Sequence, residues 1–446
     1  MKDNFKHLTQ GGDFMKKRYL VLAAIIALSA LGGCNKTEDV GSGGSVELTV
    51  VTPFSESDGN RKNFVDAYKA YEVASGNTII DHATTAIDED WKLQVLEDFR
   101  NGNEPDVINF FIGSDADELI KNDKLVSISE IRKEFPDYAS NMKESLMPVS
   151  TYDGRQYAVA VYGYWEGLFV NKKVLEDCGI EIPGVDYTWD QFIADCRIIR
   201  DKGYTPIACS LNQIPHYWFE YSVFNNGTVA SHTKVPGSAT DEVGQNWIEG
   251  LEDIKMLYEE GFFPADTNEI DDNTASLRML NDEAAFLLDG SWKVGWFQDE
   301  AQKSGVDIDN FTVTYFPSKG ARKSTDAVGG FSMGYSITRK AWEDPAKRQA
   351  CVDFVTAMTT DEVAATFGEL TVTALKNGVA LSGEDLDMLA VSTLAMTKGC
   401  TAMVPATQDL LKPAARESLF KNIPNIVTGK ITSEEAVEEC LALMAE

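Results

Sequence analysis

Short apolar runs alternate with amphipathic segments along most of the chain. Residues 46–50 alternate apolar and polar side chains, which predicts a strand, and the apolar residues of 61–74 recur at helical spacing. The same pattern predicts a strand at 78–82, a helix at 91–99 and a strand at 106–112. Because strands and helices alternate, the pattern indicates an α/β fold with a mostly parallel sheet.

The alternation resumes after Gly154 and continues towards the C-terminus. Strands are expected at 156–160, 168–170, 204–210 and 283–288, and helices near 189–199, near 247–258 and after Asp344-Pro345. Two capping boxes, at 188–191 and 432–435, predict helix N-termini, since the Thr hydroxyl and the Gln or Glu three residues later satisfy free N–H groups.

The N-terminal segment has the features of an export signal. Three basic residues, 16–18, precede an apolar run, Tyr19–Leu31, that is too short to span a bilayer. The following Leu31-Gly32-Gly33-Cys34 is similar to a bacterial lipobox, in which a lipidated cysteine becomes the first residue of the mature chain. We expect a signal peptide at 1–33 with its true start at Met15, lipidation at Cys34 and a flexible tether at 34–45. A plain secretory signal is the alternative.

Length and charge limit the class of protein. A chain of 446 residues favours two large lobes over a single core. The net charge of −30 argues against nucleic-acid binding and against a basic membrane-binding surface. The seven cysteines form no C-x-x-C pair and there are four histidines, so no zinc ligand set is visible and neither a metal nor a cofactor is expected. We interpret the cysteines other than Cys34 as mostly buried, small apolar residues.

Five segments in order carry a family resemblance. They are the helix, NGNEP break and DVINFF strand at 91–111; GRQYAV at 154–159 with GLFVNK at 167–172; YTWD at 187–190; AAFLLDGSW at 284–292; and the segment from Gly329-Gly330-Phe331 to Thr338. In this order and spacing they resemble motifs of the extracellular solute-binding proteins, family 1, of ABC importers. The segment after Pro405, ATQDLLKP, lacks the aromatic residue that maltodextrin-type relatives place there, which favours a smaller sugar.

The resemblance implies a type II periplasmic-binding-protein-like fold, with two discontinuous lobes joined by hinge strands around a ligand cleft. Lobe one would comprise 46–158 and 331–395, and lobe two 159–330 and 396–446, with crossings near Val159, near Phe331 and at 390–396. It also implies a function: a monomer, lipid-anchored at the extracellular face of the membrane, would capture a small polar solute, most simply a carbohydrate, by lobe closure. It would deliver this solute unchanged to the permease subunits of the importer.

A sugar offers hydroxyl groups and apolar C–H faces, so its site needs aromatic rings beside carboxylates or amides. Residues of these types fall mostly in segments that follow predicted strands or near the presumed crossings. The expected ligand contacts are Glu56, Asp58, Phe111, Tyr164, Trp165, Glu166, His216, Trp218, Asp289, Trp292 and Phe331. Trp165 and Trp292 are expected to face the cleft, and Trp218 is balanced between cleft and core. Taken singly, Glu56, Asp58 and Glu166 also fit solvated surface acids.

Two other functions stay open at this point. A secreted glycoside-acting enzyme needs two carboxylates at a fixed separation, which the sequence does not exclude. A surface sensor or adhesin could use the same lobes. The absence of G-x-S-x-G, H-E-x-x-H and P-loop motifs leaves serine hydrolase, zinc protease and nucleotide hydrolase functions without support.

Overall fold

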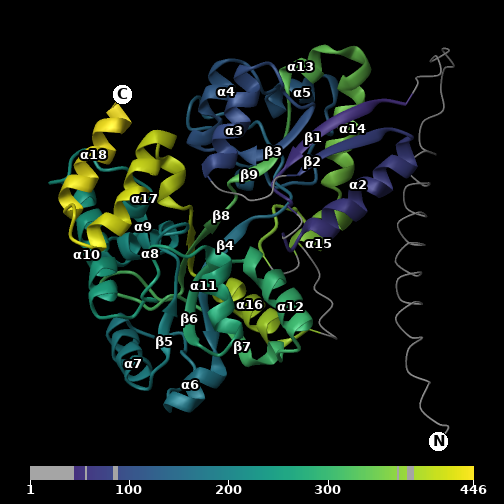
Figure 1. The fold of residues 1–446 in the computed structure, drawn as a ribbon. Coiled ribbons are helices and arrows are strands. Elements are labelled where there is room, and N and C mark those ends of the chain that lie inside the picture. The colour runs from purple at the N-terminus through teal and green to yellow at the C-terminus, as the bar shows by residue number, and fades with distance from the viewer. Residues whose placement is uncertain (1–44, 56–57, 84–88, 369–370, 379–385, 446) are drawn as a thin grey trace, which may run out of the picture.

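The computed structural model describes residues 45–55, 58–83, 89–368, 371–378 and 386–445. The strands in these ranges form two sheets, one in each half of the molecule (Figure 1). None of the helices in these ranges combines the length and the apolar character needed to cross a bilayer. The expected signal peptide, Cys34, most of the tether and Glu56 lie outside the described residues.

The first sheet has the strand order β2–β1–β3–β9. β1 (Glu47–Thr52) pairs in parallel with β2 (Thr78–Ala83) and β3 (Val107–Phe111), and β9 (Met333–Ile337) is antiparallel to β3. Its helices are α2 (Arg61–Ser75), α3 (Glu89–Arg100), α4 (Asp117–Lys121), α5 (Ile128–Glu134), α13 (Arg339–Glu343), α14 (Pro345–Met358) and α15 (Asp361–Gly368), with the short turns η2 (Ser114–Ala116) and η3 (Glu144–Leu146). This sheet with its helices is lobe one.

The second sheet has the order β10–β8–β4–β6–β5, and β7 also pairs with β4. Its strands are β4 (Tyr164–Asn171), β5 (Thr205–Ala208), β6 (Ala284–Gly290), β7 (Phe311–Thr314), β8 (Asp326–Gly330) and β10 (Ala402–Val404). β4 is antiparallel to β6, β7 and β8, so the expectation of a mostly parallel sheet is wrong here. The reason is connectivity: the chain enters lobe two through β4 and returns towards lobe one through β8, so these two strands run in opposite directions.

Helices cover this second sheet and complete lobe two. They are α6 (Lys172–Cys178), α7 (Trp189–Asp201), α8 (His216–Asn226), α9 (Val229–His232), α10 (Glu242–Glu259), α11 (Asp272–Leu280), α12 (Trp292–Ser304), α16 (Met388–Gly399), α17 (Pro413–Val427) and α18 (Ser433–Ala445), with the turns η4 (Ile308–Asn310) and η5 (Thr407–Leu410). Both predicted capping boxes are confirmed: Thr188 caps α7 reciprocally with Gln191, and Thr432 and Glu435 do the same at α18.

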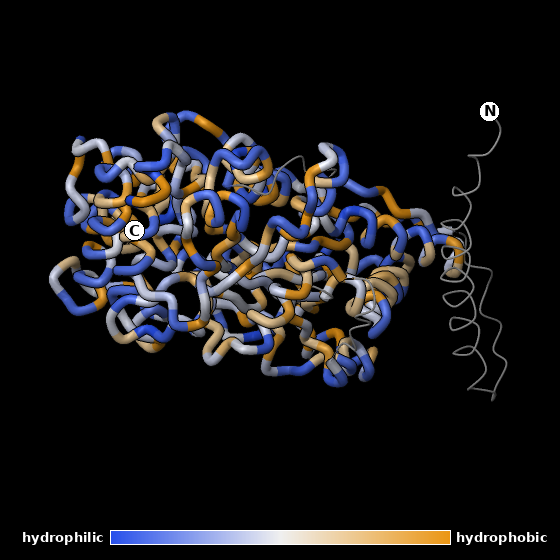
Figure 2. The backbone as a smooth tube through the Cα atoms, turned by 90° about the horizontal axis from the view of Figure 1, so that it is seen from below, coloured by the Kyte–Doolittle hydropathy of each residue, from blue (hydrophilic) through white to orange (hydrophobic). Residues whose placement is uncertain are grey.

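Each lobe has its own apolar core. In the described part of the chain, the buried clusters around Tyr335 and Trp91 draw on lobe one, and those around Trp247 and Phe297 draw on lobe two. Figure 2 shows hydrophilic segments along many of the outer loops. The six described cysteines are free, and all but the half-buried Cys400 are buried, as expected for small apolar residues. Because no described cluster spans both lobes, each can move as a unit.

Two described segments connect the lobes and touch each other. The N–H groups of Val159 and Tyr335 each donate to the carbonyl oxygen of the other residue at 3.0 Å, which pairs the two crossings. The strand predicted at 156–160 therefore reduces to isolated bridges. At Gly163 a Cβ atom would lie 2.3 Å from the carbonyl oxygen of Gly330 and 2.5 Å from the Val372 side chain, so only glycine fits at this position.

The third connection differs from the expected position at 390–396. The N–H of Val313 in β7 donates to the Ser392 hydroxyl at 3.0 Å, and the Tyr315 hydroxyl donates to the carbonyl oxygen of Met396 at 2.6 Å. α16 therefore packs on the second sheet along its length, within lobe two. The apolar residues of α16 complete the lobe-two core around Phe297, which explains why this helix belongs there.

Candidate functional site

Three aromatic rings meet at the end of the second sheet that is nearest lobe one. Tyr164 is the first residue of β4, directly after the crossing at Gly163, and Trp292 is the first residue of α12. The Trp292 ring centroid lies 6.3 Å from that of Tyr164 and 5.6 Å from that of Tyr217, and all three rings are half-buried. We call these three residues the aromatic patch. It leaves part of each ring accessible for stacking.

Local sequence explains how Trp292 reaches this position. The Trp292 ring folds back over the last residue of β6, where a Cβ atom on Gly290 would lie 2.2 Å from the ring. Gly290 in turn pairs with Glu166 across the sheet. Since residues two apart on a strand point to the same side, Glu166 shares a face of β4 with Tyr164. The aromatic patch therefore lies beside the Glu166 side chain.

Glu166 is a buried carboxyl group, and few hydrogen bonds compensate for its removal from water. Its side chain belongs to a residue only 1 % exposed, and no hydrogen-bond donor reaches Oε2. Burial raises the pKa of Glu166 well above its usual value, and the neighbouring acids Glu220, Asp289 and Asp409 raise it further. Burial therefore favours the neutral carboxylic acid over the carboxylate, and the neutral form can donate a hydrogen bond.

The pKa values of other acids near the aromatic patch are also raised. Asp289 is fully buried, and burial raises its pKa to about 7 although Lys293 Nζ lies 3.6 Å from Oδ2. Burial also raises the pKa of the half-buried Asp409 to about 6 and that of Glu220 to about 8. Glu220 accepts hydrogen bonds from the N–H groups of Thr407 and Gln408 at 2.6 and 2.8 Å, which fixes the η5 turn.

Lobe one approaches the patch with the loop that follows β1. Asp58 in this loop is half-buried, and burial raises its pKa to about 6 although the Asn60 N–H donates to it. The next residue, Gly59, lies so close to Gly295 of α12 that a Cβ atom added to Gly295 would come within 3.1 Å of its Cα. The carboxyl end of a parallel strand thus faces the aromatic edge of lobe two, as is typical of ligand sites in α/β proteins.

A second contact between the lobes consists of charged groups. Arg416 of α17 is fully buried, and its Nη2 atom donates to Oε2 of Glu89 at 2.6 Å and also to Oδ1 of Asp115. Lys92 Nζ lies 2.8 Å from Oε1 of Glu89 and 3.5 Å from Oδ2 of Asp115. This cluster of Glu89, Lys92, Asp115 and Arg416 is called the inter-lobe ion cluster below.

The inter-lobe ion cluster borders the aromatic patch through His216. The His216 ring centroid lies 4.2 Å from that of Tyr217. Burial lowers the pKa of His216 to about 3, and the positive charges of Lys92 and Arg416 lower it further, so the ring is neutral at physiological pH. Charged groups from both lobes therefore flank one side of the patch.

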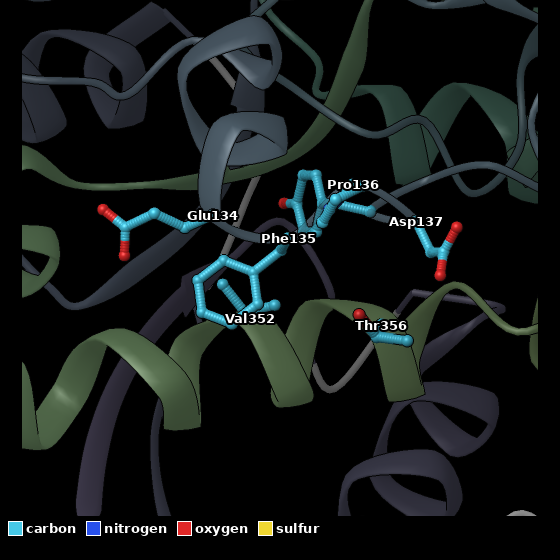
Figure 3. A pocket seen from close by; sticks show the side chains of 7 residues that line it. Glu134, Phe135, Pro136, Asp137, Val352 and Thr356 are labelled. Atoms are coloured by element: carbon cyan, nitrogen blue, oxygen red, sulfur yellow. The ribbon is translucent and has the colours of Figure 1, made fainter. Parts of the chain in front are cut away.

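A shallow surface pocket of about 320 Å³ lies elsewhere, on lobe one (Figure 3). Residues 134–138, which end α5 and follow it, line this pocket together with Val352 and Thr356 of α14. Its Glu134 carboxylate is already paired with Arg348 at 3.0 Å. Because all of its lining comes from lobe one, closure of the lobes cannot enclose a ligand there.

Residues 86–365 match the family described as bacterial extracellular solute-binding protein. This chain belongs to that family. The resemblance seen in the five sequence motifs and the two-lobed α/β fold class are thereby confirmed. No curated protein sequence gives a significant match to this solute-binding protein.

Solved structures of similar fold include several sugar-binding proteins. A chitin oligosaccharide binding protein is 22% identical with a TM-score of 0.76, over 90% of this chain and 98% of that one. A solute-binding protein in complex with raffinose is 17% identical with a TM-score of 0.67, over 90% and 99%. The maltose/maltodextrin-binding domain from Bdellovibrio bacteriovorus, bound to maltotriose, is 16% identical with a TM-score of 0.68, over 90% and 99%. These likenesses show the fold of this solute-binding protein.

The structure brings several of the expected ligand contacts together. Tyr164, Glu166, Asp289 and Trp292 lie at one edge of the second sheet, and Asp58 faces that edge from lobe one. Phe111 and Phe331 are half-buried on lobe one. The first ends β3 beneath Lys92, whose Nζ lies 4.3 Å from the ring centroid, and the second packs against the core around Tyr335.

Trp165 and Trp218 are core residues, contrary to the cleft positions considered for them. Trp165 is fully buried and stacks on Phe169, because it points to the face of β4 opposite to Tyr164. Trp218 is 2 % exposed: α8 begins at His216, and the helix turns Trp218 into the core against Phe316.

The expected ligand contacts include neither Tyr217 nor any member of the inter-lobe ion cluster. Tyr217 lies in an aromatic run, and only the register of α8 separates its half-exposed ring from the buried ring of Trp218. No local signal could have found Arg416, since its partner Asp115 is 301 residues away.

Trp165 and Trp292 were both predicted to face the cleft, but their replacement should now have different effects on stability. Trp165→Ala should lower the free energy of unfolding by about 3–5 kcal/mol, because it leaves a large cavity in the lobe-two core. Trp292→Ala, which truncates a half-exposed ring, should cost less than half as much. Guanidinium unfolding of both variants measures the difference, and equal losses would contradict the burial described here.

The pKa of Glu166 predicts how its replacement changes stability with pH. Because the pKa of Glu166 is raised in the folded state, the folded protein holds this proton more tightly than the unfolded chain, which ionises the group around its ordinary pKa of about 4.5. The stability that the group contributes is therefore complete below about pH 4.5 and declines as the pH rises. Glu166→Gln, which mimics the neutral acid, should match the parent Tm at pH 4 and exceed it at pH 8.

Glu260 supplies a control of opposite sign. Its hydrogen bond with Arg197 lowers its pKa, so Glu260→Gln should leave the Tm at pH 8 unchanged or slightly reduced. Thermal melts of the three proteins at pH 4, 6 and 8 compare the two predictions. A Tm difference between Glu166→Gln and the parent that is the same at every pH would show that folding does not shift the pKa of Glu166.

Proposed function

We propose that this chain is the substrate-binding component of an ABC importer, which captures a carbohydrate between its lobes and passes it unchanged to a membrane permease. The observation that carries the proposal is the aromatic patch of Tyr164, Tyr217 and Trp292, which adjoins buried carboxyl groups at the edge of lobe two nearest lobe one. The chain belongs to a family of binding proteins, which supports capture without a reaction.

The chemistry of the patch suits a sugar. Half-buried rings can stack against the apolar C–H face of a pyranose, and each well-placed ring adds on the order of 1 kcal/mol beyond its buried area. Glu166 in its neutral form donates a hydrogen bond to a hydroxyl oxygen, whereas ionised carboxylates accept from hydroxyl groups. Similar folds were solved with raffinose and maltotriose, which supports a carbohydrate as the ligand class.

The number and position of the aromatic rings favour a short ligand. The described aromatic contacts of the patch join three rings at one place, and residues 405–412 include no aromatic side chain. The η5 turn in that segment is held by Glu220 and lies against lobe one, where a Cβ atom on Gly113 would be 2.8 Å from the carbonyl oxygen of Asp409. This arrangement supports a monosaccharide or a short oligosaccharide.

Separate cores and narrow crossings support capture by hinge closure. Rigid lobes that flex about a few crossing residues typically close within microseconds to milliseconds. Lipidation at Cys34 would keep the protein at the extracellular face of the membrane, close to the permease, and the protein would act as a monomer.

A thermal-shift screen over mono- and oligosaccharides tests the proposal, because a ligand that binds only the folded state raises the Tm. Trp292→Ala should weaken binding of the best sugar about tenfold or more, measured by calorimetry. This corresponds to the loss of about 1.4 kcal/mol of stacking and contact free energy.

Trp296→Ala is the matched control, since Trp296 is also half-buried on α12 but lies outside the patch. The affinity of this variant for the sugar should stay within about twofold of that of the parent. Equal weakening in both variants, or hydrolysis of the bound sugar, would refute the proposal.

A further inference from the structure

The inter-lobe ion cluster joins the lobes at a place away from their crossings. Arg416 belongs to α17 of lobe two, whereas Glu89 and Lys92 belong to α3 and Asp115 to η2 of lobe one. Figure 1 shows α17 near α3 and α4 at one side of the molecule, while β8 and β9 run through its middle. The lobes are thus held covalently at the middle and by charges at the side.

Hydrogen bonds and close backbone contacts extend this junction. The Ser114 hydroxyl donates to the carbonyl oxygen of Leu411, again between the lobes. Gly113 lies against Asp409, as described above. Arg416 also uses Nε to reach Oε2 of Glu89 at 2.9 Å and Nη1 to reach Oδ2 of Asp115 at 3.3 Å. Several donors of the guanidinium group are therefore satisfied only by lobe one.

These contacts exist only while the lobes are together. Arg416 is fully buried and Asp115 is 2 % exposed, so both would regain water if the lobes parted. Charge-assisted hydrogen bonds of this geometry are about twice as strong as neutral ones. Removing one partner of a buried pair leaves the other charge without compensation, which is strongly destabilising for that arrangement.

We propose that Arg416 is a positioning residue for ligand capture, whose ion pairs with Asp115 and Glu89 latch the closed lobes and slow the release of the ligand. The inference rests on the proposed function, because it assumes a sugar bound between the lobes. Through the contact of His216 with Tyr217, the latch lies next to the aromatic patch. Arg416 acts on the ligand through lobe geometry rather than by contact.

Release kinetics of the mature protein test the latch. Arg416→Met should raise the dissociation rate of the best sugar from the screen about tenfold or more, while the association rate changes by less than about threefold, in stopped-flow tryptophan fluorescence. Arg416→Lys, which keeps the charge but loses the planar fork, should be intermediate. Arg197→Met is the control, since it removes an exposed arginine paired with Glu260 within lobe two; its release rate should equal that of the parent.

Milder changes keep the test informative if Arg416→Met does not fold. Glu89 is 32% exposed, and Glu89→Gln should raise the release rate by a smaller factor without loss of secondary structure by circular dichroism. In a double-mutant cycle, Asp115→Asn combined with Arg416→Lys should accelerate release by less than the product of the two single effects, because both act on one interaction.

Small-angle scattering of the ligand-free proteins separates the latch from the proposed function. Arg416→Lys and Glu89→Gln should give a larger radius of gyration than the parent and Arg197→Met. If no sugar binds, the proposed function fails, but this larger radius would still support the latch. Folded variants with the parental radius of gyration, or with the parental release rate, would overturn it.

Discussion

The separation of the two apolar cores is the constraint on which the rest of this structure depends. Each sheet buries its own clusters, and in the described residues the lobes meet through glycines, hydrogen bonds and charged side chains rather than through shared apolar packing. Polar contacts cost less to exchange for contacts with water than apolar cores cost to open. The lobes can therefore part and rejoin without unfolding either one.

The carboxyl groups near the patch follow from the same constraint. Glu166 and Asp289 lie at the inner end of the second sheet, where neighbouring strands and helices remove them from water. Their raised pKa values follow from burial of the carboxyl groups, which disfavours the ionised forms. Such groups weaken the ligand-free protein, and a hydroxyl-rich ligand that supplies the missing hydrogen bonds recovers part of that loss.

Local features of this fold could be predicted from the sequence, and features that depend on register could not. Hydrophobic spacing placed β1, α2, α3 and β3 within about two residues at each end, and the capping box at Thr188 is a contact within one turn. Trp165 was misplaced because the strand was predicted only at 168–170, whereas β4 begins at Tyr164 and is buried on both faces. The third crossing was misplaced because α16 belongs to lobe two through its packing against β7, which no local pattern reveals. The inter-lobe ion cluster was not predicted because it joins residues about 300 positions apart. The family motifs supplied the two-lobed architecture that periodicity alone leaves open.

The tight meeting of chain segments at Gly163 has a consequence for how such a protein can diversify. A Cβ atom at Gly163 would collide with the carbonyl oxygen of Gly330 and with the Val372 side chain, so this crossing has no room for a larger residue. New solute preferences must then arise from residues carried on the lobes, such as the first turns of α8 and α12, whose side chains can be exchanged without altering the path of the connecting chain. The sequence at the crossing is therefore constrained, whereas the residues that would contact the solute remain free to vary.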